Sequence, residues 1–240
     1  MITPPVRKAS AARNLLLMLL GLLVFGSLGT WQLNRSGERR AELAAFASAK
    51  AALPVTGLHA VPAGGDNRRV RLMGRYEADR QVLLDSMTHE GLRGYHVLTP
   101  LHTGPGMVLV NRGFVAGDPD RSRLPDLAVG EELREVTGMA APYFRRGMRL
   151  EDSGADTSWP RRLVYPTAGE LRELLGESLP DFQLLLDSSE PDGYVRAWRP
   201  YGLEPERHLA YAVQWYGLAA AAAGIWLAVT LRRGRTRDAN

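Results

Sequence analysis

The chain contains two long stretches without charged side chains, one near each end of its 240 residues. The first runs from Asn14 to Asn34 and the second from Leu209 to Leu231, and most of their side chains are apolar. At a rise of about 1.5 Å per residue, each stretch makes a helix of roughly 30 Å, the thickness of the hydrocarbon layer of a membrane. The pattern predicts transmembrane helices at residues 14–34 and 208–231. The alternative is a pair of buried helices in a soluble protein, and such helices rarely stay uncharged for so long.

Between these stretches, residues 35–207 show the short alternating segments that are typical of β-strands. In residues 69–76, Val, Leu, Gly and Tyr at the even positions alternate with mostly Arg at the odd positions, as expected for a strand with one buried face. Further predicted strands are residues 81–86, 95–101, 107–115, 133–140 and 182–187, with helices at 37–53 and 167–175. Turn-forming residues at 103–106 predict a hairpin. Because the connections are too short for crossover helices, we expect a mostly antiparallel sheet.

The basic residues at the two ends predict the orientation in the membrane. They are Arg7, Lys8, Arg13, Arg232, Arg233, Arg235 and Arg237. Basic flanks stay on the cytoplasmic side, so both tails, residues 1–13 and 232–240, are expected in the cytoplasm and residues 35–207 outside it. The predicted fold class is therefore an α+β membrane protein, multi-pass in the plasma (inner) membrane. Its two transmembrane helices flank a mostly antiparallel β extracytoplasmic domain.

Charge and composition exclude several classes of function. Residues 35–207 carry 23 Lys and Arg against 25 Asp and Glu, so the net charge of +4 comes from the tails and predicts no nucleic-acid partner. The first apolar stretch is longer than the 7–15 residues or so of a signal-peptide core, so we expect an uncleaved anchor. The absence of cysteine excludes disulfides and thiolate metal sites, and no Met-rich cluster is present. We therefore expect neither copper nor zinc.

The sequence lacks the standard catalytic motifs, including GxSxG, HExxH and the P-loop, so no enzyme activity is expected. Arg112 is nevertheless unusual for its position. It alternates onto the same face as Val108, Val110 and Phe114, which would bury its guanidinium group. Two explanations stay open: an arginine at a bulge or sheet edge that pairs with an acidic residue, or a contact with a partner protein.

His208 stands at the outer end of the second apolar stretch. At 100° per residue, its side of the helix also carries Tyr211, Ala212 and Trp215. An imidazole beside flat apolar groups at a membrane edge can ligate haem iron, although Tyr and Trp also serve there as interfacial anchors. The opposite side of the helix predicts a small-residue packing seam against the first helix. Its members are Gly217, Ala221, Gly224 and Ala228.

Several blocks of this sequence resemble the motifs of the Surfeit locus protein 1 family. Residues 28–35, LGTWQLNR, close the first apolar stretch and are similar to the family's LGxWQxxR. Alternating positions in 70–76, then GYHVLTP at 94–100 and VNRGFV at 110–115, continue the match, and the last is close to the family's VNRGWVP. HLAYAVQWYGL at 208–218 is similar to HLxYAxxWFGL. These blocks lie in the family's order and cover nearly the whole chain.

The resemblance implies a membrane-bound factor that assists assembly of haem–copper cytochrome c oxidase. Its expected partners are the catalytic subunit of the oxidase, other assembly factors and membrane lipid, and a homo-oligomer is compatible with the family. The resemblance also implies that His208 ligates transiently bound haem a. Together with the helix-face pattern, this predicts that Tyr211 and Trp215 pack on the macrocycle.

Other residues are expected to contact a partner protein, namely Trp31, Arg35 and Arg112. An alternative role is a membrane-anchored scaffold that stabilises a nascent oxidase subunit without binding haem. The sequence departs from the family at Glu206 and Arg207, because relatives commonly have an Asn one or two residues before the terminal histidine. The group that would orient His208 is therefore not evident from the sequence.

Overall fold

The chain forms two units in the computed structural model. One unit comprises Met1–Ala45 with Pro200–Asn240, and the other comprises Phe46–Arg199. The structure describes the chain except residues 1–5, 119, 121–122, 144–157, 177 and 239–240, and it describes no side chains for residues 6–11 and 234–238.

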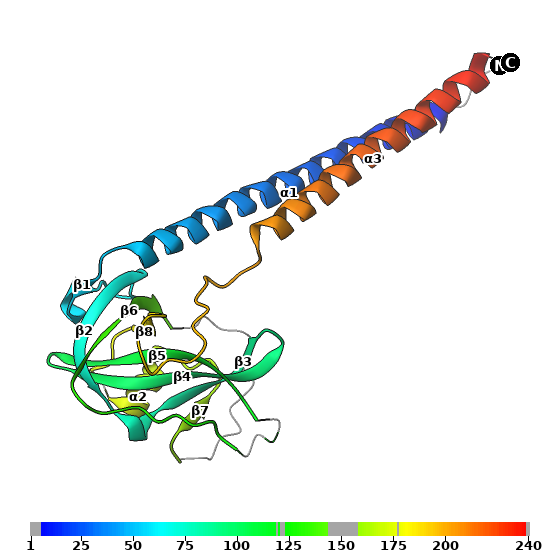
Figure 1. The fold of residues 1–240 in the computed structure, drawn as a ribbon. Coiled ribbons are helices and arrows are strands. Elements are labelled where there is room, and N and C mark those ends of the chain that lie inside the picture. The colour runs from blue at the N-terminus through cyan, green and yellow to red at the C-terminus, as the bar shows by residue number, and fades with distance from the viewer. Residues whose placement is uncertain (1–5, 119, 121–122, 144–157, 177, 239–240) are drawn as a thin grey trace. The chain divides into compact units, whose positions relative to one another are not determined.

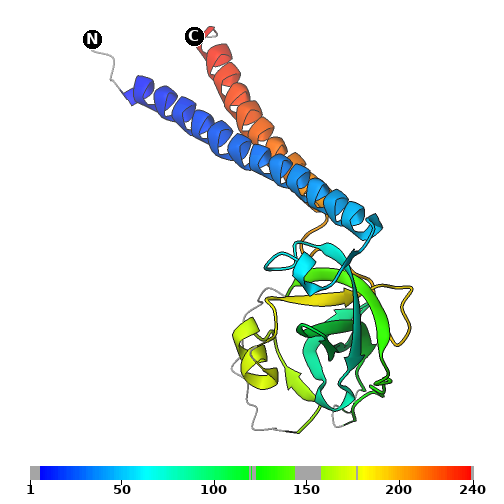
Figure 2. The ribbon, with the colours of Figure 1, turned by 90° about the vertical axis from the view of Figure 1, so that its left-hand side faces the viewer.

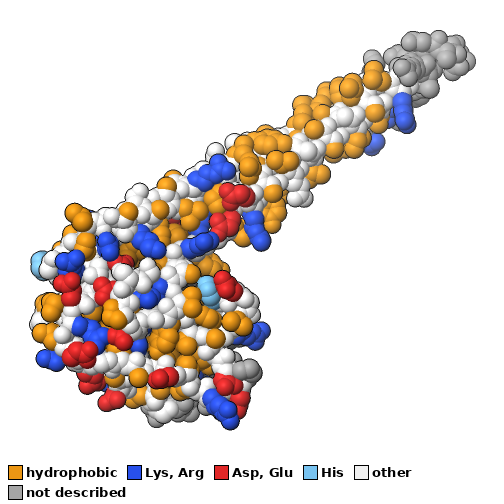
Figure 3. Space-filling model, in the orientation of Figure 1, with side chains coloured by type: hydrophobic (Ala, Val, Ile, Leu, Met, Phe, Trp, Pro, Cys, Tyr) orange, Lys and Arg blue, Asp and Glu red, His pale blue; other side chains and the backbone are white. Residues whose placement is uncertain are grey.

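Two long helices make up the first unit, α1 (Val6–Ala51) and α3 (Pro205–Asp238) (Figure 1). Both are long and apolar enough to cross a membrane, over Ala12–Ala51 and Pro205–Arg233. Only 6% and 11% of the residues in their most apolar windows are buried, unlike the core helix of a soluble protein. Figure 3 shows apolar side chains along most of the visible surface of these helices.

The helix α1 continues without a break through residues 37–53, where a separate helix was predicted. It ends at Ala51, three residues before Pro54, whose ring and missing N–H oppose helix continuation. Its last residues, from Phe46 on, belong to the second unit.

The second unit is a β-rich domain that contains every predicted strand. Its strands are β1 (Val55–Thr56), β2 (Arg68–Tyr76), β3 (Val82–His89), β4 (Leu92–Thr103), β5 (Gly106–Ala116), β6 (Arg134–Pro142), β7 (Arg161–Leu163) and β8 (Phe182–Leu186). The helix α2 (Ala168–Leu175) lies beside the strands (Figure 2), and single turns of 3₁₀ helix occur at Leu58–Ala60 and Ala78–Arg80. A capping box between Thr167 and Glu170 starts α2.

The strand order is β1-β2-β6-β8-β5-β4-β3-β7, and an additional pairing of β2 with β4 closes five of these strands into a ring. The sheet is mixed, so the expectation of a mostly antiparallel sheet was wrong. β1 with β2, β3 with β7 and β5 with β8 are parallel. The prediction considered only connections between consecutive strands, whereas β8 joins β5 after the chain has passed through β6, β7 and α2.

The core follows the alternation of the strands. One apolar cluster is formed by β2, β4, β5, β6 and β8, and a second by β3, β4, β5 and the buried face of α2. The residues of α2 in this core are Leu171 and Leu175, which lie one helical turn apart. The strand β5 thus contributes to both apolar clusters, and all eight of its residues from Met107 to Phe114 are buried.

A chain of polar side chains crosses this apolar interior. His96 Nδ1 lies 3.3 Å from Asn111 Oδ1, and Asn111 Nδ2 donates to Gln183 Oε1 at 2.9 Å. Gln183 in turn donates to the carbonyl oxygen of Pro142, and Asn111 Oδ1 also accepts from the backbone N–H of Gly113. Each amide is therefore satisfied inside the domain, as buried polar groups require. Burial lowers the pKa of His96 to about 4, the hydrogen bond with Asn111 opposing this effect.

We predict that His96 makes the domain less stable as the pH falls from about 6.5 to 4. In this window the unfolded chain takes up a proton at His96, whereas the folded chain does not, so folding loses on the order of 2 kcal/mol. The measurement is the pH dependence of the unfolding free energy of the detergent-solubilised chain. His96→Gln should show a shallower dependence than the wild type. The matched control, His59→Gln at an exposed histidine, should keep the wild-type slope, and equal slopes in all three proteins would contradict the assignment.

Candidate functional site

The two long helices of the first unit pack against each other in antiparallel directions. A Cβ on Gly21 would contact Ala222, the ring of Phe25 stacks on Trp215 at 5.9 Å, and Gln32 contacts His208. Residue numbers therefore fall along one helix as they rise along the other. Contacts at residues 21, 25, 29, 32 and 36 of α1 recur every three or four residues, the spacing of one helix face.

The contact face of α3 is not the small-residue seam that the sequence suggested. Positions 217, 221, 224 and 228 are exposed. Instead Ala212 and Ala219 are buried, on the side of the helix that carries His208 and Trp215. The close approach comes from α1, because a Cβ on Gly29 would lie 2.9 Å from the ring of Tyr216. A stripe of small residues allows two helices to approach closely, but here the close approach is formed by the Tyr216 ring of α3 over Gly29 of α1.

His208 is held by a hydrogen bond to α1. Its Nδ1 lies 2.8 Å from Gln32 Oε1. An amide oxygen can only accept, so Nδ1 carries the proton and the lone pair resides on Nε2. Histidine ligands of metals are commonly oriented in this way, with one ring N–H donated to an oxygen and the other nitrogen turned to the metal. The orienting group that the sequence did not reveal is therefore Gln32, 176 positions away.

The turn that leads into α3 is tied to the same face of α1. Ser36 Oγ donates to the carbonyl oxygen of Pro205 at 3.0 Å. Arg39, only 5% exposed, donates from Nε to the carbonyl oxygen of Leu203 at 3.2 Å and from a terminal nitrogen to that of Pro200. These bonds hold the segment from Pro200 to Pro205, which leads directly into the helix turn that carries His208. Gln32, Ser36 and Arg39 have i, i+4, i+7 spacing, which is the one sequence signal that groups them.

The remaining helix residues singled out by the sequence fall into two groups. Trp31 is 57% exposed, Tyr211 is 44% exposed, and the exposed Arg35 forms an ion pair with Glu38 at 2.9 Å. Trp215 is only partly exposed, and its stacking on Phe25 helps to join the helices. The helix pair thus presents one oriented nitrogen donor, and the exposed aromatic rings belong to the residue before Gln32 and the residue three positions after His208. This donor set fits a metal that already has in-plane ligands, as haem iron does.

Arg112 in β5 is enclosed by the β-rich domain. Its side chain is 2% exposed, and the guanidinium carbon lies 5.0 Å from the centre of the Tyr194 ring. Its hydrogen-bond acceptors, at 2.7–3.2 Å, are the backbone oxygens of Leu127, Ala128 and Asp192 and the amide oxygen of Gln81. The expected acidic partner was wrong, because neutral oxygens satisfy the charge. The contact with a partner protein stays a prediction, and it would have to involve the residues that cover this buried side chain.

The residue after Arg112, Gly113, allows another segment of the chain to lie close against β5. Gly113 has φ 111°, and a Cβ there would lie 2.6 Å from the carbonyl oxygen of Val195. Only glycine accommodates both the left-handed conformation and this approach. The VNRGFV block therefore fastens the segments around residues 127 and 192–195 to β5.

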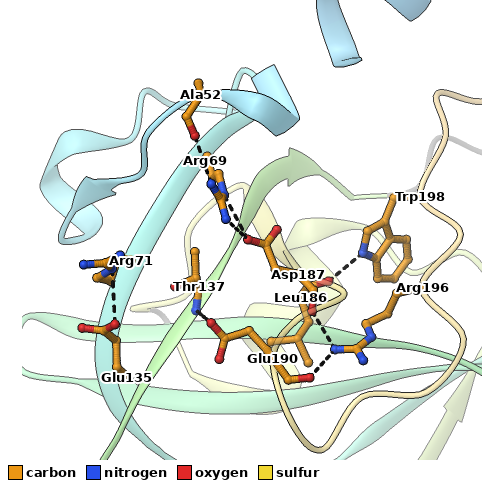
Figure 4. Close-up of polar contacts among 10 residues, drawn as sticks. All are labelled: Ala52, Arg69, Arg71, Glu135, Thr137, Leu186, Asp187, Glu190, Arg196 and Trp198. Atoms are coloured by element: carbon orange, nitrogen blue, oxygen red, sulfur yellow. Dashed lines mark hydrogen bonds and ion pairs between the residues drawn. The ribbon is translucent and has the colours of Figure 1, made fainter. Parts of the chain in front are cut away.

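Both segments that connect the β-rich domain to the long helices lie on one region of its sheet. Phe46 and Ala49 at the end of α1, and Trp198 before α3, pack against Met139, Ala141 and Leu185. In Figure 4, Arg69 joins Asp187 at 2.6 Å and also donates to the carbonyl oxygen of Ala52 at 3.1 Å.

The later connection is held by its own bonds (Figure 4). Trp198 Nε1 donates to the carbonyl oxygen of Leu186 at 2.8 Å, and Arg196 donates to those of Asp187 and Glu190, each at 2.6 Å. Glu190 closes the turn by accepting from the backbone N–H of Thr137. The end of β8 thus anchors the chain where it enters and where it leaves the domain.

We predict that Arg112→Ala unfolds the β-rich domain more easily, by about 3 kcal/mol or more, because a large buried side chain and its four hydrogen bonds are lost. Denaturant unfolding of the purified chain measures this loss. The control is Arg71→Ala, since Arg71 is 47% exposed and its ion pair with Glu135 should contribute little. An Arg112→Ala protein of wild-type stability that nonetheless failed to support oxidase assembly would instead favour a partner contact.

Comparison with known proteins gives consistent matches over most of the chain. The model of the SURF1 family matches residues 19–220, which include part of each apolar helix and the whole intervening sheet. Surfeit locus protein 1 of the fish Takifugu rubripes is 25% identical over 90% of this chain and 96% of its own length. Surfeit locus protein 1 of Mus musculus is 27% identical over 90% of this chain and 75% of its own. A SURF1-like protein of Rickettsia bellii is 25% identical over 86% of each.

Proposed function

The chain belongs to the SURF1 family, known for oxidase assembly factors, and on that premise we propose that it binds haem a for cytochrome c oxidase. In this proposal the protein receives haem a at His208 and assists its delivery to the catalytic subunit. The family match includes His208 and Gln32, the two residues on which the proposed site depends.

The proposed location is the plasma (inner) membrane, with α1 and α3 each crossing it once. Two observations support this location: the low burial of the apolar helices and the basic residues of both tails. With both tails in the cytoplasm, His208 and the β-rich domain belong to the outer side. His208 would then sit at the outer edge of the hydrocarbon layer, next to the exposed rings of Trp31 and Tyr211.

The oriented imidazole is the observation that carries the haem proposal. Haem is the cargo here, and its iron accepts an axial nitrogen donor while its macrocycle requires apolar cover. Gln32 holds the Nδ1 proton of His208, which keeps the Nε2 lone pair available to the iron. Trp31 and Tyr211 provide flat apolar surface beside it. A single protein ligand at a partly exposed position suits a carrier, because the bond can be exchanged for the ligand of the recipient.

A second candidate function is a scaffold that stabilises a nascent oxidase subunit without binding haem. It is favoured by large apolar side chains that the β-rich domain leaves exposed to the extent of 50% or more. They are Leu53, Met73, Leu92 and Leu133. Such side chains are common at protein contact sites, although single ones also occur on ordinary surfaces. The two functions differ in whether the purified protein carries haem.

We predict that the full chain, purified in detergent from cells that make haem a, shows a haem Soret absorption band. His208→Ala should lose most of this band, because no other residue on this face of the pair supplies an imidazole. His59→Ala, which removes an exposed histidine of the β-rich domain, is the matched control and should keep the band. A colourless wild-type protein from such cells, with normal yield, would exclude haem binding and leave the scaffold function.

A further inference from the structure

Two arginines lie near His208, at the end of the helix pair where the charged residues next to the β-rich domain meet the uncharged stretches. Arg207 directly precedes His208, and Arg35 follows the His208 partner Gln32 by three residues, about 4.5 Å along the helix axis. Both side chains are exposed. Neither takes part in the bonds that fix the helix pair, which come instead from Gln32, Ser36 and Arg39.

The contact pattern places these arginines on one side of the pair. Arg35 directly precedes the contact residue Ser36, and Arg207 directly precedes the contact residue His208. One step along a helix turns 100° in the same sense, so residues that precede contact positions on two antiparallel helices point to the same side. Arg40 directly follows the buried Arg39 and therefore points to the other side.

The aromatic residues share the side of the two arginines. Trp31 directly precedes Gln32, and Tyr211 directly precedes the buried Ala212. Both rings lie within the apolar stretches, whereas Arg35 and Arg207 are the first charged residues beyond them. This side of the pair therefore has flat apolar groups toward the membrane interior and two cations at its boundary, and His208 lies next to Arg207 at the start of the apolar stretch of α3. The arrangement complements a planar apolar ligand that carries carboxylate groups at one edge.

We propose that Arg35 and Arg207 bind the carboxylate groups of the haem whose iron is held by His208. This inference rests on the haem-binding function proposed above and assigns the orientation of the ligand in that site. Arg35 is available for this role because its ion pair with Glu38 is exposed at both partners, 54% and 65%, and such pairs are weak and easily exchanged. The two carboxylates would then point out of the membrane and the rest of the ring into it.

The test compares two probes, ferric protoporphyrin IX haem and its dimethyl ester, which lacks the carboxylate charges. Each is titrated into the apo form of the full chain in a zwitterionic detergent, and the Soret band reports binding. The wild type should bind the free acid roughly tenfold more tightly than the ester. Arg35→Ala and Arg207→Ala should each lower affinity for the acid about three- to fivefold, leave affinity for the ester unchanged, and together remove the preference. Arg40→Ala, the matched control, should change neither affinity.

The outcomes distinguish carboxylate binding by the two arginines from haem binding at His208. If the wild type binds acid and ester equally, with both lost in His208→Ala, haem binding stands and the role of the two arginines is refuted. If the arginine variants weaken acid and ester alike, the arginines act on the helices or on lipid, and the inference again fails. If the wild type binds neither probe, the haem site itself is absent and both proposals fall.

Discussion

The hydrogen bond between Gln32 and His208 joins the two apolar helices where their uncharged stretches end. In an apolar environment both side chains would be costly to bury without a partner, so each satisfies the other. Interhelical bonds of this kind contribute roughly 0.5–2 kcal/mol in membranes. The bond therefore has two effects: it sets the register of the helices, and it determines which nitrogen of His208 can bind a metal.

Contacts on both sides of this bond preserve its geometry. Toward the apolar interior, Thr30 Oγ1 donates to the carbonyl oxygen of Gly26 and so accepts from the hydroxyl of Tyr216, at 3.0 Å. In the other direction, Ser36 and Arg39 hold the turn before α3. Within the β-rich domain, Arg69 and Trp198 fix the connections to the helices on one region of the sheet. Side-chain hydrogen bonds thus hold the segments in which the chain passes from one unit to the other.

The local parts of this structure could be predicted from the sequence, and the parts formed by distant residues could not. Strand patterns and turn signals located six of the eight strands and missed the short strands β1 and β7, and alternation placed Arg112 in the interior. The partners of Arg112 were missed because they come from loops 15 or more positions away, and backbone oxygens leave no trace in the sequence. The parallel pairing of β8 with β5 was missed for the same reason. At the proposed site, the pattern drew attention to His208, whereas its hydrogen-bond partner Gln32 looked like one more polar residue at a helix end.

The central claim is that Gln32 fixes the tautomer of His208, and nitrogen-15 NMR of the histidine-labelled chain in detergent micelles tests it directly. Above pH 7.5, with His208 assigned from the His208→Gln variant, the account predicts a protonated Nδ1 and an unprotonated Nε2 at His208. Gln32→Leu should shift this ring toward the Nε2–H tautomer that free histidine prefers. Finding the Nε2–H tautomer at His208 of the wild-type protein would contradict the account.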